Sequence, residues 1–92
     1  MARVTLEVPR ILRDCTDGRA QVELDADRFD SAFEAIREGW PVLATHVFAE
    51  TGALRPHVLL LHNDQLTARE LPLDAPLAPG DRLTLIQAVS GG

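Results

Sequence analysis

Residues 20–36, AQVELDADRFDSAFEAI, contain the change of hydrophobic period that determines the fold. In the first five residues apolar and polar side chains alternate, which is typical of a half-buried β-strand. Further along, apolar residues recur at helical spacing and form one stripe along a helix: Phe29, Ala32, Phe33 and Ile36. The sequence therefore predicts a strand at 20–24 and a helix that begins near Phe29.

The two ends of this helix carry their own signals. Asp27 is a candidate N-cap, and Ser31 with Glu34 has the spacing of a capping box one turn later. Gly39-Trp40-Pro41 is expected to end the helix. A short helical turn is expected in 42–48.

Strand signals lie on both sides of the helix. Residues 3–8 alternate strictly, and turn residues at 14–18 join them to strand 20–24 as a hairpin. After the helix, 57–62 is an apolar strand, and Asn63-Asp64 is a tight turn that leads to a short partner strand near 66–69. The last strand is predicted at 82–86.

This order of elements predicts the fold class. A domain this small has two layers, so one helix covers one face of the sheet. A right-handed crossover through the helix places a later strand parallel to the first. We therefore expect an α+β domain of the β-grasp, or ubiquitin-like, type over residues 1–88, with a mixed sheet of four to five strands and one main helix packed on one face. Residues 89–92 are expected to form a flexible C-terminal tail.

Composition and charge narrow the classes of function. The chain has 92 residues, of which 46% are hydrophobic, enough for one modest core. A net charge of −5 argues against nucleic acid. It suits a basic partner, although plain solubility is the commoner reason for such a charge. All nine basic residues are arginine, which excludes a lysine nucleophile and a P-loop lysine. A genome rich in guanine and cytosine would produce the same bias.

Location and chemistry are constrained mainly by what the sequence lacks. No apolar run approaches the roughly 18 residues of a membrane span, and residues 1–4 lack the apolar stretch of a signal peptide, so a cytoplasmic location is expected. The single cysteine, Cys15, has no adjacent base. The three histidines lack the spacing of a zinc site: His46, His57 and His62. We predict no catalytic residue and no metal ligand, and hence no enzyme.

The C-terminus is the most unusual feature of the chain. Gly91-Gly92 closely follows the last predicted strand, where glycine costs backbone entropy and does nothing for the fold. A stretch without Cβ atoms can enter a narrow channel and bring a terminal carboxylate to a nucleotide phosphate. A loose terminus or an expression remnant would look the same from this dipeptide alone.

A second unusual feature is a strand that is apolar on both faces. Val58 and Leu60 lie on one face, and Leu59 and Leu61 lie on the other, which Ile86 joins from the last strand. With a helix on only one face, the outward set predicts an exposed patch of the kind that marks protein interfaces: Leu59, Leu61 and Ile86. Alternatively, residues 42–48 or 72–79 fold over these side chains.

Over nearly its whole length the chain resembles the ThiS/MoaD family of prokaryotic sulfur carriers. The opening Val8-Pro9-Arg10-Ile11-Leu12-Arg13, with Thr16 and Gly18, is most similar to the branch that carries sulfur for cysteine synthesis. Three positions depart from the family pattern: Asp64 replaces a usual glycine, Gln87 a frequent proline and Leu59 a common polar residue. The resemblance rests on the following segments: Leu54-Arg55-Pro56-His57-Val58, Asn63, Pro76-Leu77 with Gly80-Asp81, and Ala88-Val89-Ser90-Gly91-Gly92.

The resemblance implies a reaction cycle at the C-terminus. An E1-like adenylating enzyme, using ATP and magnesium, would convert the Gly92 carboxylate to an acyl-adenylate, and a sulfur donor would displace AMP to leave a thiocarboxylate. A sulfur-accepting synthase would then take the sulfur. The carrier itself would bind no cofactor. Gly91 and Gly92 would be the reacting site, and the partners would dock on Leu59, Leu61, Ile86, Ala88, Val89 and Ser90.

Three other functions remain open from the sequence. The chain could be the small subunit of molybdopterin synthase, whose tail enters the active site of a large subunit. It could be a ubiquitin-like modifier joined to target lysines through Gly92, which could not form lysine-linked chains on itself. It could also be a plain β-grasp interaction module, in which case the two glycines would be dispensable.

Overall fold

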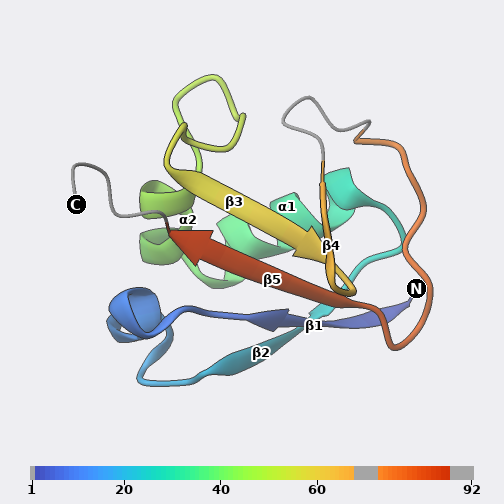
Figure 1. Cartoon of the computed structure of the whole chain (residues 1–92), viewed down its shortest axis with the longest axis horizontal. Coiled ribbons are helices and arrows are strands. Elements are labelled where there is room, and N and C mark those ends of the chain that lie inside the picture. The colour runs from blue at the N-terminus through green and yellow to red at the C-terminus, as the bar shows by residue number, and fades with distance from the viewer. Residues whose placement is uncertain (1, 68–72, 88–92) are drawn as a thin grey trace.

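The computed structural model describes residues 2–67 and 73–87 and confirms the β-grasp prediction. In these residues five strands form one mixed sheet in the order β2-β1-β5-β3-β4 (Figure 1). Strand β1 pairs antiparallel with β2 and parallel with β5, which is the arrangement that a crossover through the helix predicts. The strands are β1 (Arg3–Glu7), β2 (Gln21–Asp25), β3 (Val58–His62), β4 (Gln65–Leu66) and β5 (Arg82–Gln87).

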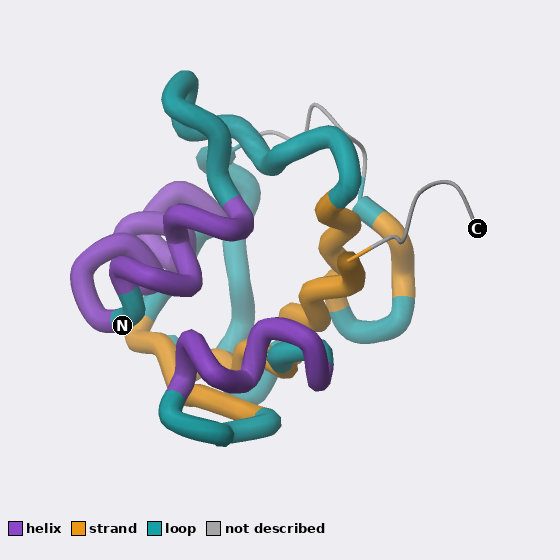
Figure 2. Tube along the Cα trace, turned by 90° about the vertical axis from the view of Figure 1, so that its left-hand side faces the viewer, coloured by secondary structure: helices purple, strands orange, loops and turns teal. Residues whose placement is uncertain are grey.

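Two α-helices lie against one face of this sheet. Helix α1 (Phe29–Gly39) buries the predicted stripe of Phe29, Ala32, Phe33 and Ile36. Helix α2 (Pro41–Val47) follows at once and begins one residue before the predicted helical turn. Figure 2 shows both α-helices on the same side of the twisted sheet, so the described chain has the expected two layers. In the described residues no helix is long and apolar enough to cross a membrane.

The segment between β1 and β2 is more ordered than the predicted turn at 14–18. It forms a 3₁₀ helix, η1 (Arg10–Thr16), which ends at Asp17 (φ 56°) and Gly18 (φ 82°) in left-handed conformation. Thr16 is fully buried, and its hydroxyl donates to the Arg19 carbonyl at 2.8 Å. Helix η1 packs against α2, so contacts with a segment distant in sequence stabilise it.

Helix α1 ends at Gly39, as predicted, but the two predicted N-terminal caps are wrong. Arg28, not Asp27, occupies the N-cap position, and its side chain makes no capping bond. Ser31 lies inside the helix, where its N–H donates to Asp30 Oδ1 at 2.7 Å, so Ser31 and Glu34 form no capping box. The first N–H groups of the helix instead donate to backbone carbonyls of Ala75 and Leu73, at 3.2 and 2.8 Å. A distant loop therefore satisfies the groups that a side-chain cap would have taken.

The core lies between the helices and the inner face of the sheet. Side chains alternate between the two faces of each strand, so β1 contributes Val4 and Leu6, and β5 contributes Leu83 and Leu85. The opposite, outer face of the sheet is left uncovered by α1 and α2. That face therefore holds the candidate site.

Candidate functional site

Four apolar side chains lie together on the outer face of the sheet. Leu59 of β3 is directly opposite Ile86 of β5, and Leu61 of β3 is directly opposite Leu66 of β4. Residues that face each other across paired strands project to the same side of a sheet. Leu59, Leu61, Leu66 and Ile86 therefore form one apolar surface, which we call the outer patch.

The outer patch is open over its margins and half-buried at its centre. Leu66 is 62% exposed and Ile86 37% exposed, whereas Leu59 and Leu61 are half-buried. Exposed apolar groups gathered on one face are characteristic of a surface that binds another protein. The predicted members of the patch therefore do lie on one face.

The two segments that could have covered the outer patch instead, 42–48 and 72–79, lie elsewhere as far as the structure describes them. Helix α2 points its apolar residues Leu43, Ala44 and Val47 into the core. The Leu73 carbonyl and the Leu77 N–H bond to the backbone of Asp30 and Asp27, at the start of α1 on the inner side of the sheet. Within residues 41–48 and 73–79, neither segment folds over the outer patch.

Leu66 is the member that sequence reasoning missed. The tight turn at Asn63-Asp64 is predicted correctly, but β4 has only two residues and is too short to show alternation. The distance along the chain from the turn would have identified it. A two-residue turn at Asn63-Asp64 pairs His62 with Gln65 and therefore places Leu61 opposite Leu66.

Charged groups occupy the remainder of the outer face, on β1, β2 and the start of β5. Arg82 forms ion pairs with Glu7, at 3.3 Å, and with Asp64. Arg3 forms ion pairs with Glu23, at 3.1 Å, and with Asp25, at 3.4 Å. The outer face thus has an apolar half, on β3, β4 and the end of β5, and a charged half, on β1, β2 and the start of β5.

The strand that carries Ile86 leads toward the C-terminus. Strand β5 ends at Gln87, whose Cα is paired with Val58 and whose Oε1 atom is buried without a hydrogen-bond partner among the described residues. The remaining predicted site residues lie outside the residues that the structure describes: Ala88, Val89, Ser90, Gly91 and Gly92. Their predicted roles stay predictions.

At the other end of β5, Asp81 joins two segments of the sheet. Its carboxylate accepts hydrogen bonds from His62 Nε2 (2.8 Å), Asn63 Nδ2 (3.1 Å) and the Ala78 N–H (2.9 Å). These bonds, with that from His62 the strongest, lower the pKa of Asp81 below its usual value of 3.8. The His62 ring also packs edge-on against Phe29, at 5.3 Å between centroids. This cluster therefore holds the β3–β4 turn to the start of β5.

The other titratable residues singled out from the sequence are dispersed. His46 and His57 are exposed and Cys15 is half-buried. Among the described residues, no group of three or more His, Cys, Asp or Glu side chains could hold a metal ion.

Comparison with known proteins identifies the family. The sequence pattern of the ThiS family matches residues 6–92. Small archaeal modifier protein 1 of Haloferax volcanii is 34% identical over 73 residues, which are 78% of this chain and 79% of that protein. Its crystal structure has a TM-score of 0.81 at 29% identity, covering 99% of this chain and 100% of that one.

Two further solved structures share the whole architecture. CysO of Mycobacterium tuberculosis has a TM-score of 0.80 at 25% identity, covering 94% of this chain and 99% of that one. A chain of the BexX/CysO complex of Amycolatopsis orientalis has a TM-score of 0.83 at 27% identity, covering 97% and 99%. The chain belongs to the ThiS family of small ubiquitin-like sulfur carriers and modifiers.

Proposed function

We propose that the chain is a cytoplasmic sulfur carrier whose C-terminal glycine is adenylated and then converted to a thiocarboxylate. Two observations together support this proposal. The chain belongs to the ThiS family, and Gly91-Gly92 follows the last strand by only a few residues. The chain supplies the reacting terminus and a docking surface. Its partners supply the catalytic groups.

The proposed chemistry takes place on the Gly92 carboxylate in two steps. In the active site of an E1-like enzyme, a carboxylate oxygen attacks the α-phosphorus of ATP, and magnesium pyrophosphate leaves. The acyl-adenylate then has a good leaving group, so a donor of hydrosulfide can form a C–S bond as the C–O bond to AMP breaks. The product is a thiocarboxylate, which is nucleophilic at neutral pH and passes its sulfur to an accepting synthase, for cysteine or another sulfur-containing metabolite.

The outer patch is the proposed docking surface for these partners. Ile86 lies one residue before the end of β5, so a partner that covers the patch also lies close to the start of residues 88–92. Burying the four apolar side chains against the partner would supply binding energy, and the charged half of the outer face would supply a polar rim. The similar chain of Amycolatopsis orientalis was solved as part of a complex, BexX/CysO, which supports a role in protein docking.

Intact-mass analysis of the protein purified from its native host tests the proposal. The expected result is a fraction of molecules in which one oxygen is replaced by sulfur, located at Gly92 by C-terminal peptide mapping. Treatment with an alkylating reagent should add one more label to this fraction than to the oxygen form, in addition to any label on the free thiol of Cys15, because a thiocarboxylate is alkylated far faster than a carboxylate. Protein that carries only the oxygen form, even when the host is starved for reduced sulfur metabolites, would contradict the proposal.

The second candidate function is protein modification, which the name of the Haloferax volcanii relative favours. In that case the activated Gly92 carboxyl would acylate lysine amines of target proteins. The chain itself contains no lysine and would be attached as single copies rather than lysine-linked chains. Immunoblotting of host lysates separates the two functions, since conjugates of higher mass are expected for a modifier and free chain for a carrier.

A further inference from the structure

Strand β2 has an unpaired backbone edge. It lies at the end of the sheet, and among the described strands only β1 pairs with it. The Val8 N–H donates to the Ala20 carbonyl at 2.8 Å, and the Ala26 N–H donates to the Ala2 carbonyl at 2.7 Å. Because backbone groups alternate in direction along an antiparallel strand, the even-numbered residues bond to β1. The N–H and C=O groups of Gln21, Glu23 and Asp25 therefore point away from the sheet.

This edge is open within the part of the chain that the structure describes. No described residue makes a backbone hydrogen bond to Gln21, Glu23 or Asp25 from outside the β1–β2 pair. A row of unpaired donors and acceptors of this kind is a template for another extended chain. The edge can therefore accept a further strand without disturbing the existing sheet.

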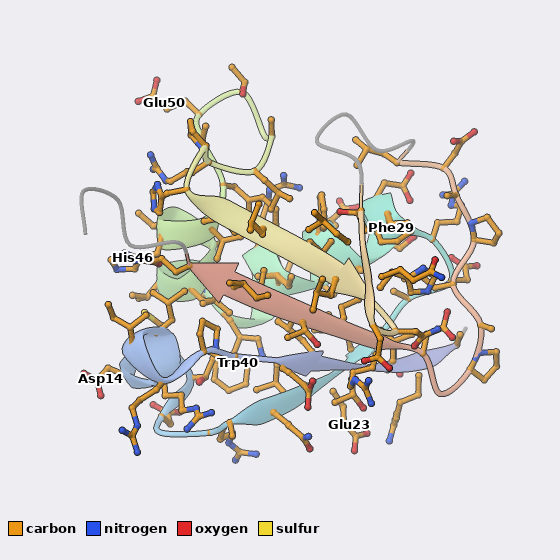
Figure 3. The ribbon with its side chains drawn as sticks, viewed as in Figure 1. Asp14, Glu23, Phe29, Trp40, His46 and Glu50 are labelled. Atoms are coloured by element: carbon orange, nitrogen blue, oxygen red, sulfur yellow. The ribbon has the colours of Figure 1, made fainter. Side chains whose placement is uncertain are left out.

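A cavity that is lined in part by Trp40 lies beside the same strand. It has a volume of about 410 Å³ and lies partly against the side chain of Trp40, which is half-buried between α1 and α2. Figure 3 shows Trp40 on the β1–β2 side of the molecule. Alternate side chains of an added strand project to the same face, so apolar residues of such a strand can pack against the Trp40 ring. The cavity is lined by Thr5, Arg19, Gln21, Val22, Glu23 and Trp40.

Charge indicates which strand fits this edge. Glu23 and Asp25 are exposed acids, and Arg3, the basic residue that contacts both, is already shared between them. If two copies of the chain paired antiparallel through β2 with Glu23 at the centre, the two Glu23 side chains would face each other, which destabilises a strand pair. With two acids against one arginine, the Glu23–Asp25 end of the edge is negative, so it disfavours a second copy and favours a basic partner. The exposed Arg19 lies at the other end, beyond Gln21.

We propose that the β2 edge binds an extended segment of a partner protein in which apolar and basic residues alternate. The segment adds to the sheet as a strand beside β2, its basic side chains lie opposite Glu23 and Asp25, and its apolar side chains pack against Trp40. This surface lies at the opposite end of the sheet from β3 and β4, which carry most of the outer patch. A partner can therefore hold the chain here while the C-terminus remains free to react, whichever reaction the terminus undergoes.

Trp40 supplies a direct readout, because it is the single tryptophan of the chain. The full-length protein is titrated with a short synthetic peptide of alternating valine and lysine, and the tryptophan emission is recorded. The expected result is a saturable change in emission that weakens as salt is added, together with slower hydrogen exchange of the Gln21, Glu23 and Asp25 amides. A matched peptide of alternating valine and glutamate should bind at least about fivefold more weakly.

Variants at position 23 separate strand addition from other binding modes. Glu23→Pro removes an N–H that points away from the sheet, so it should leave the β1–β2 ladder intact and abolish peptide binding. Glu23→Thr keeps the N–H and should retain binding, weakened a fewfold by the loss of charge. Glu23→Lys should reverse the preference toward the glutamate peptide, and it tests the proposal even if the proline variant fails to fold.

Three results would overturn the proposal. They are an unchanged Trp40 emission with the lysine peptide, equal binding by Glu23→Pro in a folded protein, and an unchanged preference in Glu23→Lys. Self-association of the protein at the concentrations used, measured by sedimentation, would instead identify a second copy as the occupant and would also count against it.

Discussion

Leu59 of β3 and Ile86 of β5 are directly opposite each other on adjacent strands, on the face of the sheet that neither α-helix covers. Their neighbours Leu60 and Leu85 form the next pair and point into the core. Two adjacent positions on one strand therefore have opposite environments. This alternation allows the docking role of the outer patch to be tested separately from folding.

Ile86→Asp should weaken binding to the E1-like activating enzyme by tenfold or more and leave melting nearly unchanged. On the free protein the new carboxylate stays hydrated, which costs about 1 kcal/mol or less. In a complex it must be desolvated without a partner, which costs several kcal/mol. Leu85→Asp is the matched control, because that residue is 2% exposed and a charge there should unfold the domain. If Ile86→Asp melts as early as Leu85→Asp, the patch is part of the core.

Leu66→Asp tests whether the patch extends to β4. The side chain is 62% exposed, so the variant should fold normally and bind the activating enzyme several-fold more weakly. Leu73→Asp is a suitable control, since Leu73 is also an exposed leucine, at 48%, but lies beside the start of α1. Equal affinities of the two variants for the enzyme would confine the docking surface to β3 and β5.

Deletion of Gly91 and Gly92 should abolish adenylation, measured as exchange of pyrophosphate into ATP by the activating enzyme. The melting temperature should be nearly unchanged, because the hydrophobic core of the described residues extends no further along the chain than Leu85. Exchange by the truncated protein at the full rate would rule out a reaction at this terminus.

The elements predicted correctly are those whose signal lies in their own residues. The alternation of Val4 and Leu6 and the helical stripe from Phe29 to Ile36 depend on which side of a strand or helix faces the core, so the period of the sequence reveals them. The parallel pairing of β1 with β5 follows from the handedness of the crossover. These features are sufficient to place Leu59, Leu61 and Ile86 on one face.

The elements predicted wrongly depend on partners distant in sequence. The N–H of Phe29 finds the carbonyl of Ala75, far along the chain, and no local pattern indicates this bond. Helix η1 lacks an apolar stripe, and its order comes from packing against α2. The position of β2 at the end of the sheet likewise could not be predicted. Alternation shows which side chains of a strand face the core, but it does not show which strand lies at the edge.

Asp64→Gly should stabilise the protein by about 1 kcal/mol. Asp64 has φ 143°, a region that favours glycine, and strain of this kind costs about 1–3 kcal/mol. The substitution removes an ion pair with Arg82, but Asp64 is highly exposed there and such pairs contribute little. It also adds flexibility to the unfolded chain, which offsets part of the gain. Urea denaturation of both proteins measures the difference, and a variant less stable than the parent would show that the ion pair outweighs the strain.

The last prediction concerns Asp81 and acid. Its hydrogen bonds, above all that from His62 Nε2, lower the pKa of the folded carboxyl below the ordinary value of 3.8. A group whose pKa is depressed by folding contributes stability above its unfolded pKa, and this contribution is lost as the pH falls through the folded value. The free energy of unfolding should therefore fall below about pH 4.

Asp81→Asn isolates this contribution, because asparagine keeps the size and one acceptor oxygen but cannot titrate. At neutral pH the variant should be less stable than the parent, since the charge-assisted bonds to His62, Asn63 and the Ala78 N–H are replaced by weaker ones. As the pH falls below about 4 the difference should shrink, because the parent carboxyl then becomes protonated as well. Urea denaturation of both proteins from about pH 6 down to about pH 2.5 measures this convergence. Two curves that remain parallel over that range would mean that the bonds to Asp81 do not favour its charged form.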